Sequence, residues 1–480
     1  MIVPTNRLLF WFAAIALPFS ALGALYAEAM LLSIALIAAM LVVAVVDAAL
    51  ALGSLDSVSL QLPPLLRFSK ERDGVIEVTV QNPSRQARRL RIGLPLPPEI
   101  ASAQDDVVVT LPAEAEQSRL DWACRPLSRG NFHLRRGYLE SPSRLGFWNV
   151  RRTVPVQCEL RVYPNLLTER KDLAALFLRR GALGVHAQRQ IGKGRDFEKL
   201  RDYVPGDSFD EIHWKATARH GRPVTKVFQI ERTQEVYVII DASRLSARKV
   251  ASEGGKGGAS NQSSVISGQK GATHSLETTS SLKTDDCLLS AGTTVLERFL
   301  TAALILGQAA EQQGDLFGLL TFSDRVETFL RAKNGKAHYA ACRDAIYTLE
   351  PRPITPDFDE ISSFIRTRLR RRALLVFLTS LDDPVLAESF IRNMALLSGQ
   401  HLVLVNMIKP PDADPLFSRP DVSELDDIYR HLGGHLQWHS LRELEKVLQR
   451  RGVRFSLLAN EHLASDLVSQ YIGVKQRQLL

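Results

Sequence analysis

The sequence predicts an α/β protein with two N-terminal transmembrane helices, a β-sandwich-like segment and then a doubly wound α/β domain. Three patterns indicate this architecture. Residues 1–52 are apolar, residues 57–164 read as short strands, and from residue 235 apolar strands alternate with amphipathic helices. Residues 165–234 link the last two parts, so the 480 residues divide into a membrane hairpin, a linking segment and two folded domains.

Two apolar runs near the N-terminus have the length of membrane spans. Leu8–Tyr26 contains no charged residue, and Ala29–Val46 repeats the pattern after a break that holds Glu28. A helix rises about 1.5 Å per residue, so roughly 20 apolar residues cross a hydrocarbon core of about 30 Å. We expect both runs to span the membrane and contact its lipid. The alternative is that the first run is a cleaved signal peptide.

The charges beside these runs predict the orientation. The turn between them carries only Glu28, whereas the other ends are flanked by basic residues, namely Arg7, Arg67, Lys70 and Arg72. Cytoplasmic loops of membrane proteins carry an excess of Lys and Arg. The sequence therefore predicts a multi-pass inner-membrane protein with its soluble domains in the cytoplasm.

Composition argues against several classes of protein. The net charge is +8, from 60 Lys and Arg against 52 Asp and Glu, but basic and acidic residues are mixed, so no nucleic-acid partner is expected. The four cysteines form no CxxC pair and show no zinc spacing, which suits a reducing compartment. They are Cys124, Cys158, Cys287 and Cys342.

Short strands separated by turn residues are expected throughout residues 57–164. Turn chemistry such as Asn82-Pro83 separates runs that alternate apolar and polar residues. The predicted strands are Gly74–Val80, Leu90–Leu94, Val107–Leu111, Phe132–Leu139 and Cys158–Val162. Several short strands at this spacing favour a β-sandwich. A helix is expected next, over Leu166–Arg180.

The last part of the chain predicts a parallel sheet covered by helices on both faces. The expected strands are Val236–Ile240, Leu316–Phe322, Ala373–Thr379, His401–Met407 and Val453–Leu458. The expected helices are Thr294–Gln313, Ala337–Leu349, Phe358–Arg370, Pro384–Leu397, Ser440–Arg451 and His462–Val474. Residues 250–290, rich in Ser, Gly and Thr, are predicted to form a disordered insertion.

Oxygen ligands follow the first strand of this sheet. Asp241 and Ser243 supply a carboxylate and a hydroxyl suited to Mg²⁺, but Leu245 occupies the third place of an Asp-x-Ser-x-Ser pattern. Thr355 and Asp382 are candidates to complete the set. We therefore expect no cofactor, or Mg²⁺ at a degenerate site of these four oxygen donors. Asp241 equally fits a strand-end residue that caps the following loop.

Residues Gly192–Ser243 carry a series of specific motifs. They are Asp196-Phe197, Leu200-Arg201-x-Tyr203, Gly206-Asp207, Ile212-x-Trp214, Thr217-Ala218-Arg219 and Glu231, followed by Asp241-x-Ser243. This series resembles the signature of the domain-of-unknown-function 58 family. The resemblance implies a membrane hairpin, a β-rich segment and a domain similar to the von Willebrand factor A fold. It also implies a non-enzymatic role beside a cytoplasmic MoxR-type AAA+ ATPase, in cell-envelope or complex-assembly processes. The incomplete metal motif departs from the usual pattern of such domains.

The same segment mixes acids, bases and aromatic residues at close range. Arginine–carboxylate pairs can hold such a segment in one conformation. We interpret residues Gly192–Glu231 as an ion-paired clasp between the two soluble domains, with Trp214 contributing to stability. The alternatives are a surface that docks a partner and, third, a catalytic site.

The remaining motifs predict neither a metal site nor a catalytic site. His431, His435 and His439 recur every fourth residue, but Gly433-Gly434 is expected to end the helix that would align them. The chain has no G-x-S-x-G, H-E-x-x-H or P-loop motif, so no enzyme is predicted. The alternatives are a metal-dependent ligand-binding receptor and a membrane-tethered hydrolase.

Overall fold

The computed structural model contains two compact units, Met1–Asn165 and Leu166–Leu480. It describes residues 1–26, 29–85, 87–113, 115–167, 191–204, 209, 212–229, 234–250, 293–416, 418 and 425–477. The boundary between the units falls one residue after the predicted end of the β-rich segment. The predicted helix over residues 166–180 and the predicted insertion over 250–290 lie almost wholly outside the described residues.

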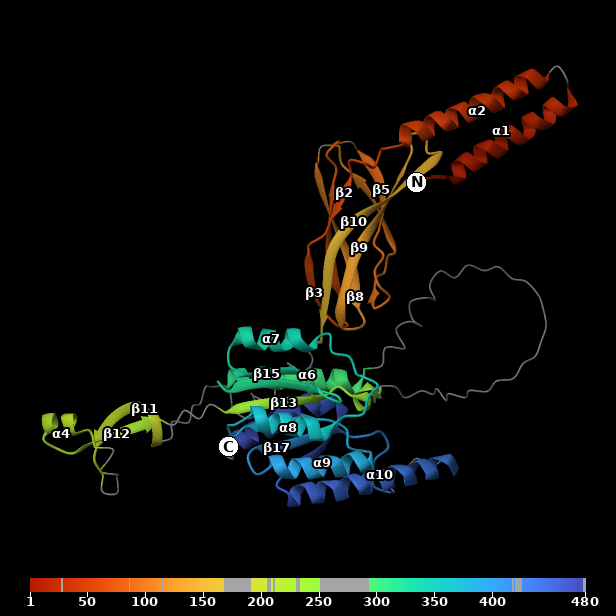
Figure 1. Ribbon diagram of the computed structural model, residues 1–480. Helices are drawn as coiled ribbons and strands as arrows, with labels where there is room; N and C mark the ends of the chain where they lie inside the picture. The colour runs from red at the N-terminus through yellow and green to blue at the C-terminus, as the bar shows by residue number, and fades with distance from the viewer. Residues whose placement is uncertain are drawn as a thin grey trace. The chain divides into compact units, whose positions relative to one another are not determined.

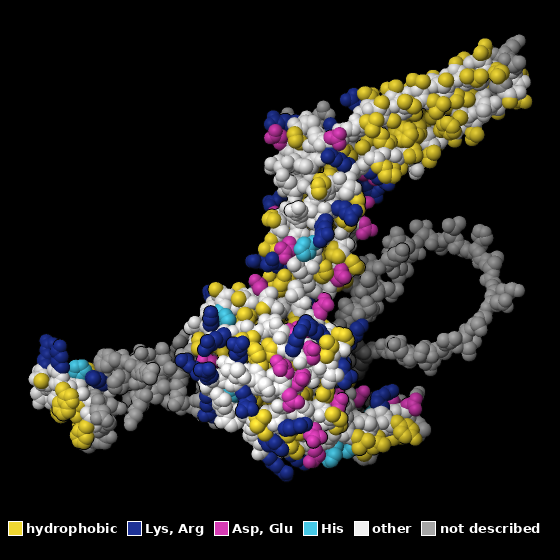
Figure 2. All heavy atoms as spheres, in the orientation of Figure 1, with side chains coloured by type: hydrophobic (Ala, Val, Ile, Leu, Met, Phe, Trp, Pro, Cys, Tyr) yellow, Lys and Arg dark blue, Asp and Glu magenta, His cyan; other side chains and the backbone are white. Residues whose placement is uncertain are grey.

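The N-terminus forms an apolar helical hairpin, α1 (Asn6–Leu25) followed by α2 (Met30–Ala51). The Thr5 side chain accepts a hydrogen bond from the Leu8 amide and so caps α1. Apolar side chains cover the hairpin in Figure 2. Among the described helices, α2 alone is long and apolar enough to cross a membrane, judged by length and composition, and α1 contributes the shorter stretch Asn6–Leu22. The prediction of two spans is therefore met for one helix.

Both ends of the hairpin are bound to the β-rich part of the same unit. Strand β1 (Ile2–Pro4) pairs antiparallel with β10 (Trp148–Tyr163) just before α1 begins. Near the end of α2, the buried Asp47 carboxylate accepts a hydrogen bond from the Ser143 hydroxyl at 2.6 Å and one from the Leu145 amide at 3.1 Å. The Trp148 indole N–H donates to the Ala44 carbonyl at 2.8 Å. A one-residue strand slip or a lost acceptor would break this attachment.

Two sheets enclose one core in the rest of unit one (Figure 1). One has the order β1-β10-β9-β5-β7, with β3 beside β10, and the other has the order β2-β4-β8-β6. Inward-facing side chains such as Ile76, Val78, Leu90 and Leu160 are fully buried between them. This is the sandwich that period-two alternation predicts. The remaining strands are β2 (Ser59–Gln61), β3 (Leu65–Ser69), β4 (Gly74–Gln81), β5 (Arg88–Gly93), β6 (Ile100–Ala101), β7 (Asp106–Leu111), β8 (Gln117–Pro126) and β9 (Gly130–Pro142).

The second unit begins with a small hairpin and a short helix. Strands β11 (Ile191–Asp202) and β12 (Val224–Gln229) pair antiparallel, and α4 (Trp214–His220) lies between them in sequence. The Thr217 hydroxyl accepts a hydrogen bond from the Val224 amide at 3.1 Å, which fixes α4 to the start of β12. The sequence did not predict these strands because charged residues interrupt their alternation.

The main part of the second unit is a six-stranded sheet with the order β15-β14-β13-β16-β17-β18. All neighbours are parallel except the edge strand β15. The strands are β13 (Glu235–Asp241), β14 (Leu316–Phe322), β15 (Val326–Lys333), β16 (Leu374–Leu378), β17 (Leu402–Ile408) and β18 (Arg454–Leu458). The predicted parallel sheet is therefore present, whereas β15 was not predicted.

Helices cover both faces of this sheet, as the doubly wound prediction requires (Figure 1). Val236, Val238 and Ile240 of β13 pack with one set of helices, and Tyr237 and Ile239 pack with the other. The first set is α6 (Val295–Gln312), α7 (Lys336–Ile346) and α11 (Leu463–Gln476). The second is α8 (Phe358–Arg368), α9 (Pro384–Leu397) and α10 (Leu425–Arg450).

One element differs clearly from its prediction. Helix α10 runs without a break through Gly433 and Gly434, so the expected helix end there was wrong. A Cβ on Gly434 would clash with the Asp412 carbonyl oxygen, whereas Gly433 has open space. Gly434 is thus required by the close approach of another segment rather than by a turn.

Candidate functional site

The carboxyl ends of the parallel strands meet at one edge of the sheet, where ligands of doubly wound folds bind. Asp241, the last residue of β13, is fully buried there. Its Oδ1 accepts a hydrogen bond from the Ser243 amide at 2.8 Å, and its Oδ2 accepts one from the Thr379 hydroxyl at 2.6 Å. Burial raises the pKa of the Asp241 carboxyl, and these hydrogen bonds oppose the shift.

Ser243 lies beside Asp241, as predicted, but its hydroxyl serves its own loop. The Ser243 Oγ accepts a hydrogen bond from the Leu245 amide at 3.3 Å and caps a short 3₁₀ helix over Arg244–Ala247. The partner that sequence reasoning missed is Thr379, directly after β16. The sequence predicts Thr379 as the last residue of the strand Ala373–Thr379, and its contact with Asp241 joins residues 138 apart in sequence.

The other two predicted ligands do not join Asp241. Asp382 pairs with Arg248, whose Nη2 donates to the Asp382 Oδ1 at 2.9 Å while Nη1 bonds the second oxygen. A guanidinium held on both oxygens occupies the positions that a cation would need. Thr355 is exposed in the loop before α8. Within the described part of the chain, no group of three or more His, Cys, Asp and Glu side chains is arranged to hold a metal ion.

Backbone pairing covers Asp241. The Arg352 amide donates to the Ala242 carbonyl at 2.7 Å, and the Arg244 amide donates to the Ile354 carbonyl at 3.0 Å. These two bonds join the loop after β13 to the loop before α8 above the carboxylate. Asp241 therefore fastens this edge of the sheet in the present conformation and does not face solvent.

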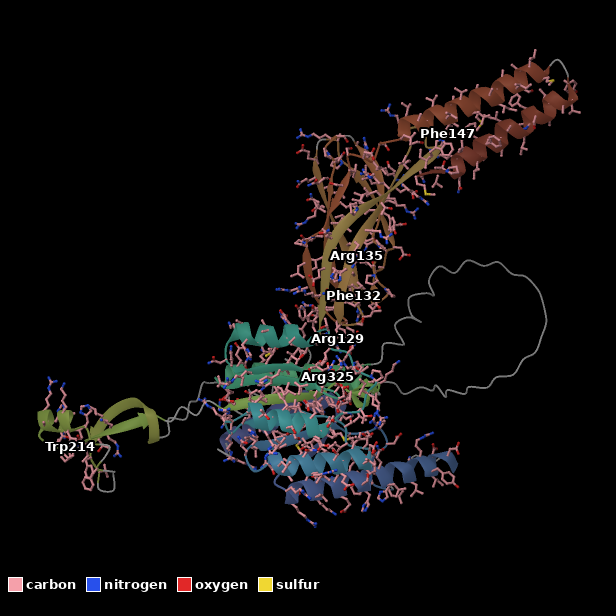
Figure 3. All side chains as sticks on the ribbon, viewed as in Figure 1. Arg129, Phe132, Arg135, Phe147, Trp214 and Arg325 are labelled. Carbon is pink, nitrogen blue, oxygen red and sulfur yellow. The ribbon has the colours of Figure 1, made fainter. Side chains whose placement is uncertain are left out.

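A second polar cluster follows β14. The fully buried Ser323 donates to the Glu327 Oε1 at 2.8 Å, and the Arg352 Nε donates to the same oxygen at 2.8 Å. Arg325, labelled in Figure 3, is exposed in the intervening turn. The hydrogen bond from Ser323 holds the pKa of Asp324 below its ordinary value. The cluster links β15 to the loop that covers Asp241.

Around these enclosed groups the strand-end edge presents exposed side chains. Arg244 is exposed, Ile354 is partly exposed, and Val385 at the start of α9 is 76% exposed. We call Arg244, Ile354 and Val385 the strand-end surface.

The histidines and the signature segment can be placed in part. His431, His435 and His439 lie on the continuous α10, where the His435 Nδ1 accepts a hydrogen bond from the Leu416 amide at 3.1 Å. Trp214, labelled in Figure 3, is 69% exposed and so contributes little burial to the fold, contrary to its predicted role. An ion pair of the predicted clasp region joins Arg222 and Asp202 at 3.2 Å. Several clasp residues, including Asp207, Asp210 and Glu231, lie outside the described residues.

The chain has weak likenesses to solved structures. An aerotolerance-related membrane protein from Bacteroides fragilis is 12% identical, with 50% of this chain and 98% of that chain covered and a TM-score of 0.28. An uncharacterised membrane-spanning protein from Vibrio fischeri is 11% identical over 50% and 98% of the two chains, with a TM-score of 0.16. Proximal thread matrix protein 1 from the mussel byssus is 12% identical over 49% and 44%, with a TM-score of 0.23. TM-scores at this level do not establish a shared fold.

A comparison with curated proteins gives no match. A family model does match, in two segments that include the signature motifs from Leu200 onward and most of the sheet. Residues 199–253 and 285–420 match the family described as protein of unknown function DUF58, which confirms the resemblance seen in the sequence over this part of the chain.

Proposed function

We propose that this protein is a membrane-anchored, non-enzymatic interaction module that works with a cytoplasmic MoxR-type AAA+ ATPase at the inner membrane. The observation that best supports membrane anchoring is that both ends of the helical hairpin are attached to the same β-sandwich. Strand β1 precedes α1 and pairs with β10, while Asp47 near the end of α2 bonds the turn before β10. This attachment supports the proposal that both ends of the hairpin lie on one side of the bilayer and that the chain crosses it twice.

Helix lengths are compatible with two crossings. Helix α2 is long and apolar enough by itself, and α1, whose apolar stretch Asn6–Leu22 is shorter, has 20 residues in all, which at about 1.5 Å per residue correspond to roughly 30 Å. Cleavage of a signal peptide within the first apolar run would remove β1 and most of α1, and with them one attachment of the hairpin. The basic residues Arg7, Arg67 and Lys70 lie on the sandwich side, which favours a cytoplasmic position for both units.

The partner is proposed from the family resemblance and from the form of the α/β domain. The strand order with one antiparallel edge strand fits the von Willebrand factor A-like fold that the resemblance implies. Asp241 is enclosed by backbone, so what the strand ends offer a partner is the strand-end surface. A membrane tether raises the local concentration of whatever the domain recruits, so an interface of modest affinity suffices.

Crosslinking in native membranes tests the partner. A photocrosslinker at Val385 is expected to capture an AAA+ ATPase, and the double variant Arg244→Glu, Val385→Asp is expected to lose its recovery. Arg451→Glu is the matched control, because Arg451 is exposed beside the start of β18, at the opposite end of the strands. Recovery by the double variant at the wild-type level would exclude this surface, and failure of the wild type to recover any ATPase would refute the partnership.

A further inference from the structure

An apolar groove runs between the two helices of the hairpin. Its volume is about 340 Å³, within the range of roughly 300–1,000 Å³ typical of small-molecule sites. Trp11, Ile15 and Phe19 line it from α1, and Leu36, Met40 and Val43 are among the side chains that line it from α2. Every lining side chain is apolar, so the groove offers nothing to a polar ligand along its length.

Phe147 closes the groove at its sandwich end. This side chain belongs to the turn between β9 and β10, and Figure 3 labels it at the base of the hairpin. The same turn supplies Ser143 and Leu145, which bond Asp47, so its position relative to the helices is fixed by hydrogen bonds. The groove is therefore formed by three elements of one compact unit.

Arginines gather at this end of the groove. Arg7 lies four residues before Trp11, and residues four apart are neighbours on one face of a helix. The Arg7 Nη1 reaches the turn, 3.3 Å from where a Cβ on Gly146 would lie. Arg144 is exposed in the same turn, and neither side chain has an acidic partner among the described residues. Asp47, the nearest acid along α2, is enclosed by its own hydrogen bonds.

We propose that this groove binds one acyl chain of an anionic phospholipid, with the lipid phosphate against Arg7 and Arg144. The inference rests on the proposed insertion of the hairpin into the membrane. Inside a bilayer an acyl chain is already surrounded by other acyl chains, so its transfer into an apolar groove gives little hydrophobic free energy. The groove alone therefore does not select one lipid over another. Selectivity comes from net charge: both classes of lipid carry a phosphate, but the choline cation of a zwitterionic lipid is repelled by the two guanidinium groups, so an anionic headgroup is favoured.

Native mass spectrometry of the full-length protein in detergent tests the site. Phosphatidylglycerol and phosphatidylcholine with identical acyl chains are added separately. We expect one phosphatidylglycerol to be retained with about tenfold higher affinity, the size expected for the attraction of one net negative charge to nearby basic side chains. The double variant Arg7→Gln, Arg144→Gln should bind both lipids equally, whereas Arg7→Lys, Arg144→Lys should keep the preference. Ala39→Phe should fill the groove and weaken the binding of both lipids.

Two controls separate the site from general effects. Val45→Phe adds the same ring to an exposed position of α2 that does not line the groove, and Arg125→Gln removes an exposed charge from β8. Both should bind lipid as the wild type does. Equal retention of the two lipids by the wild type, or an unchanged preference in the Arg-to-Gln double variant, would overturn the lipid site. Carbonate extraction distinguishes the two failures, because a wild-type protein that leaves the membrane fraction contradicts the anchoring itself.

Discussion

At the residue scale, the Asp241 carboxyl accepts hydrogen bonds from one hydroxyl and one amide, and no Lys or Arg side chain is among its described partners. Burial favours its protonated form, so its pKa in the folded state lies above the ordinary value of 3.8. The stability that this group contributes is fully present below that ordinary value and is lost as pH rises through the raised folded-state pKa. At neutral pH the charge of Asp241 is therefore a cost to folding.

The variant D241N should raise the free energy of unfolding of the α/β unit at pH 7.5 by about 1 kcal/mol. An amide keeps one acceptor for the Ser243 amide and gains a donor for the Thr379 hydroxyl. Thermal unfolding of the full-length protein at pH 7.5 and at lower pH measures this, and the gain should shrink as the pH falls. Asp382→Asn is the control, since it removes the pair with Arg248 and should destabilise by up to about 1 kcal/mol.

Addition of Mg²⁺ tests whether Asp241 is a metal ligand. We expect it to leave the wild-type unfolding midpoint unchanged, because Asp241 is covered by backbone and Asp382 is bonded to Arg248. A Mg²⁺-dependent rise in the wild-type midpoint that D241N abolishes would contradict this account and support the metal-dependent receptor instead.

His401 provides a second pH-dependent residue. It is buried before β17, and neither ring nitrogen has a hydrogen-bond partner in the described structure. Burial lowers its pKa below the ordinary value of 6.5, so the unfolded chain takes up a proton first. The stability from His401 is thus complete above pH 6.5 and is lost as pH falls toward the folded-state pKa. His401→Leu should remove this loss, up to about 1.4 kcal/mol per pH unit, and an identical pH profile for wild type and variant would refute it.

At the element scale, adjacent glycines of α10 are expected to respond in opposite directions. Gly433→Ala meets open space and should stabilise the helix by up to about 1 kcal/mol, since alanine has the higher helix propensity. Gly434→Ala meets the Asp412 carbonyl and should destabilise by about 1–3 kcal/mol. Unfolding midpoints of the two variants measure the difference. Equal midpoints would mean that α10 does not run against the Asp412 segment.

Some elements could be predicted from the sequence and others could not. The buried parallel strands were located to within a few residues, because a short continuous apolar run such as Leu316–Phe322 is typical of a strand that is buried on both faces. The consecutive glycines Gly433 and Gly434 of α10 carry no such signal, because glycine is favoured both where a helix ends and where another segment packs closely against a helix. The contact of Thr379 with Asp241 was missed for a related reason, since it depends on strand register rather than on local pattern.

At the scale of the whole molecule, one sandwich holds both ends of the apolar hairpin, which we propose spans the membrane. Length and hydropathy located the apolar runs, but the attachment depends on contacts from β1 and Asp47 to residues around 141–151, which no local pattern reveals. If the hairpin inserts as we propose, these contacts hold its two ends on one side of the membrane. The proposal therefore places the hairpin tip on the opposite side.

Alkaline phosphatase fusions test the proposed membrane crossing, because the enzyme is active only outside the cytoplasm. A fusion inserted at Glu28, between the apolar runs, is expected to be active, and one after Leu480 is expected to be inactive. An insertion at Asp73, between β3 and β4 of the sandwich, is the internal control and should also be inactive. An active fusion after Leu480, or an inactive but stably produced fusion at Glu28, would contradict a hairpin that crosses the membrane twice from the cytoplasm.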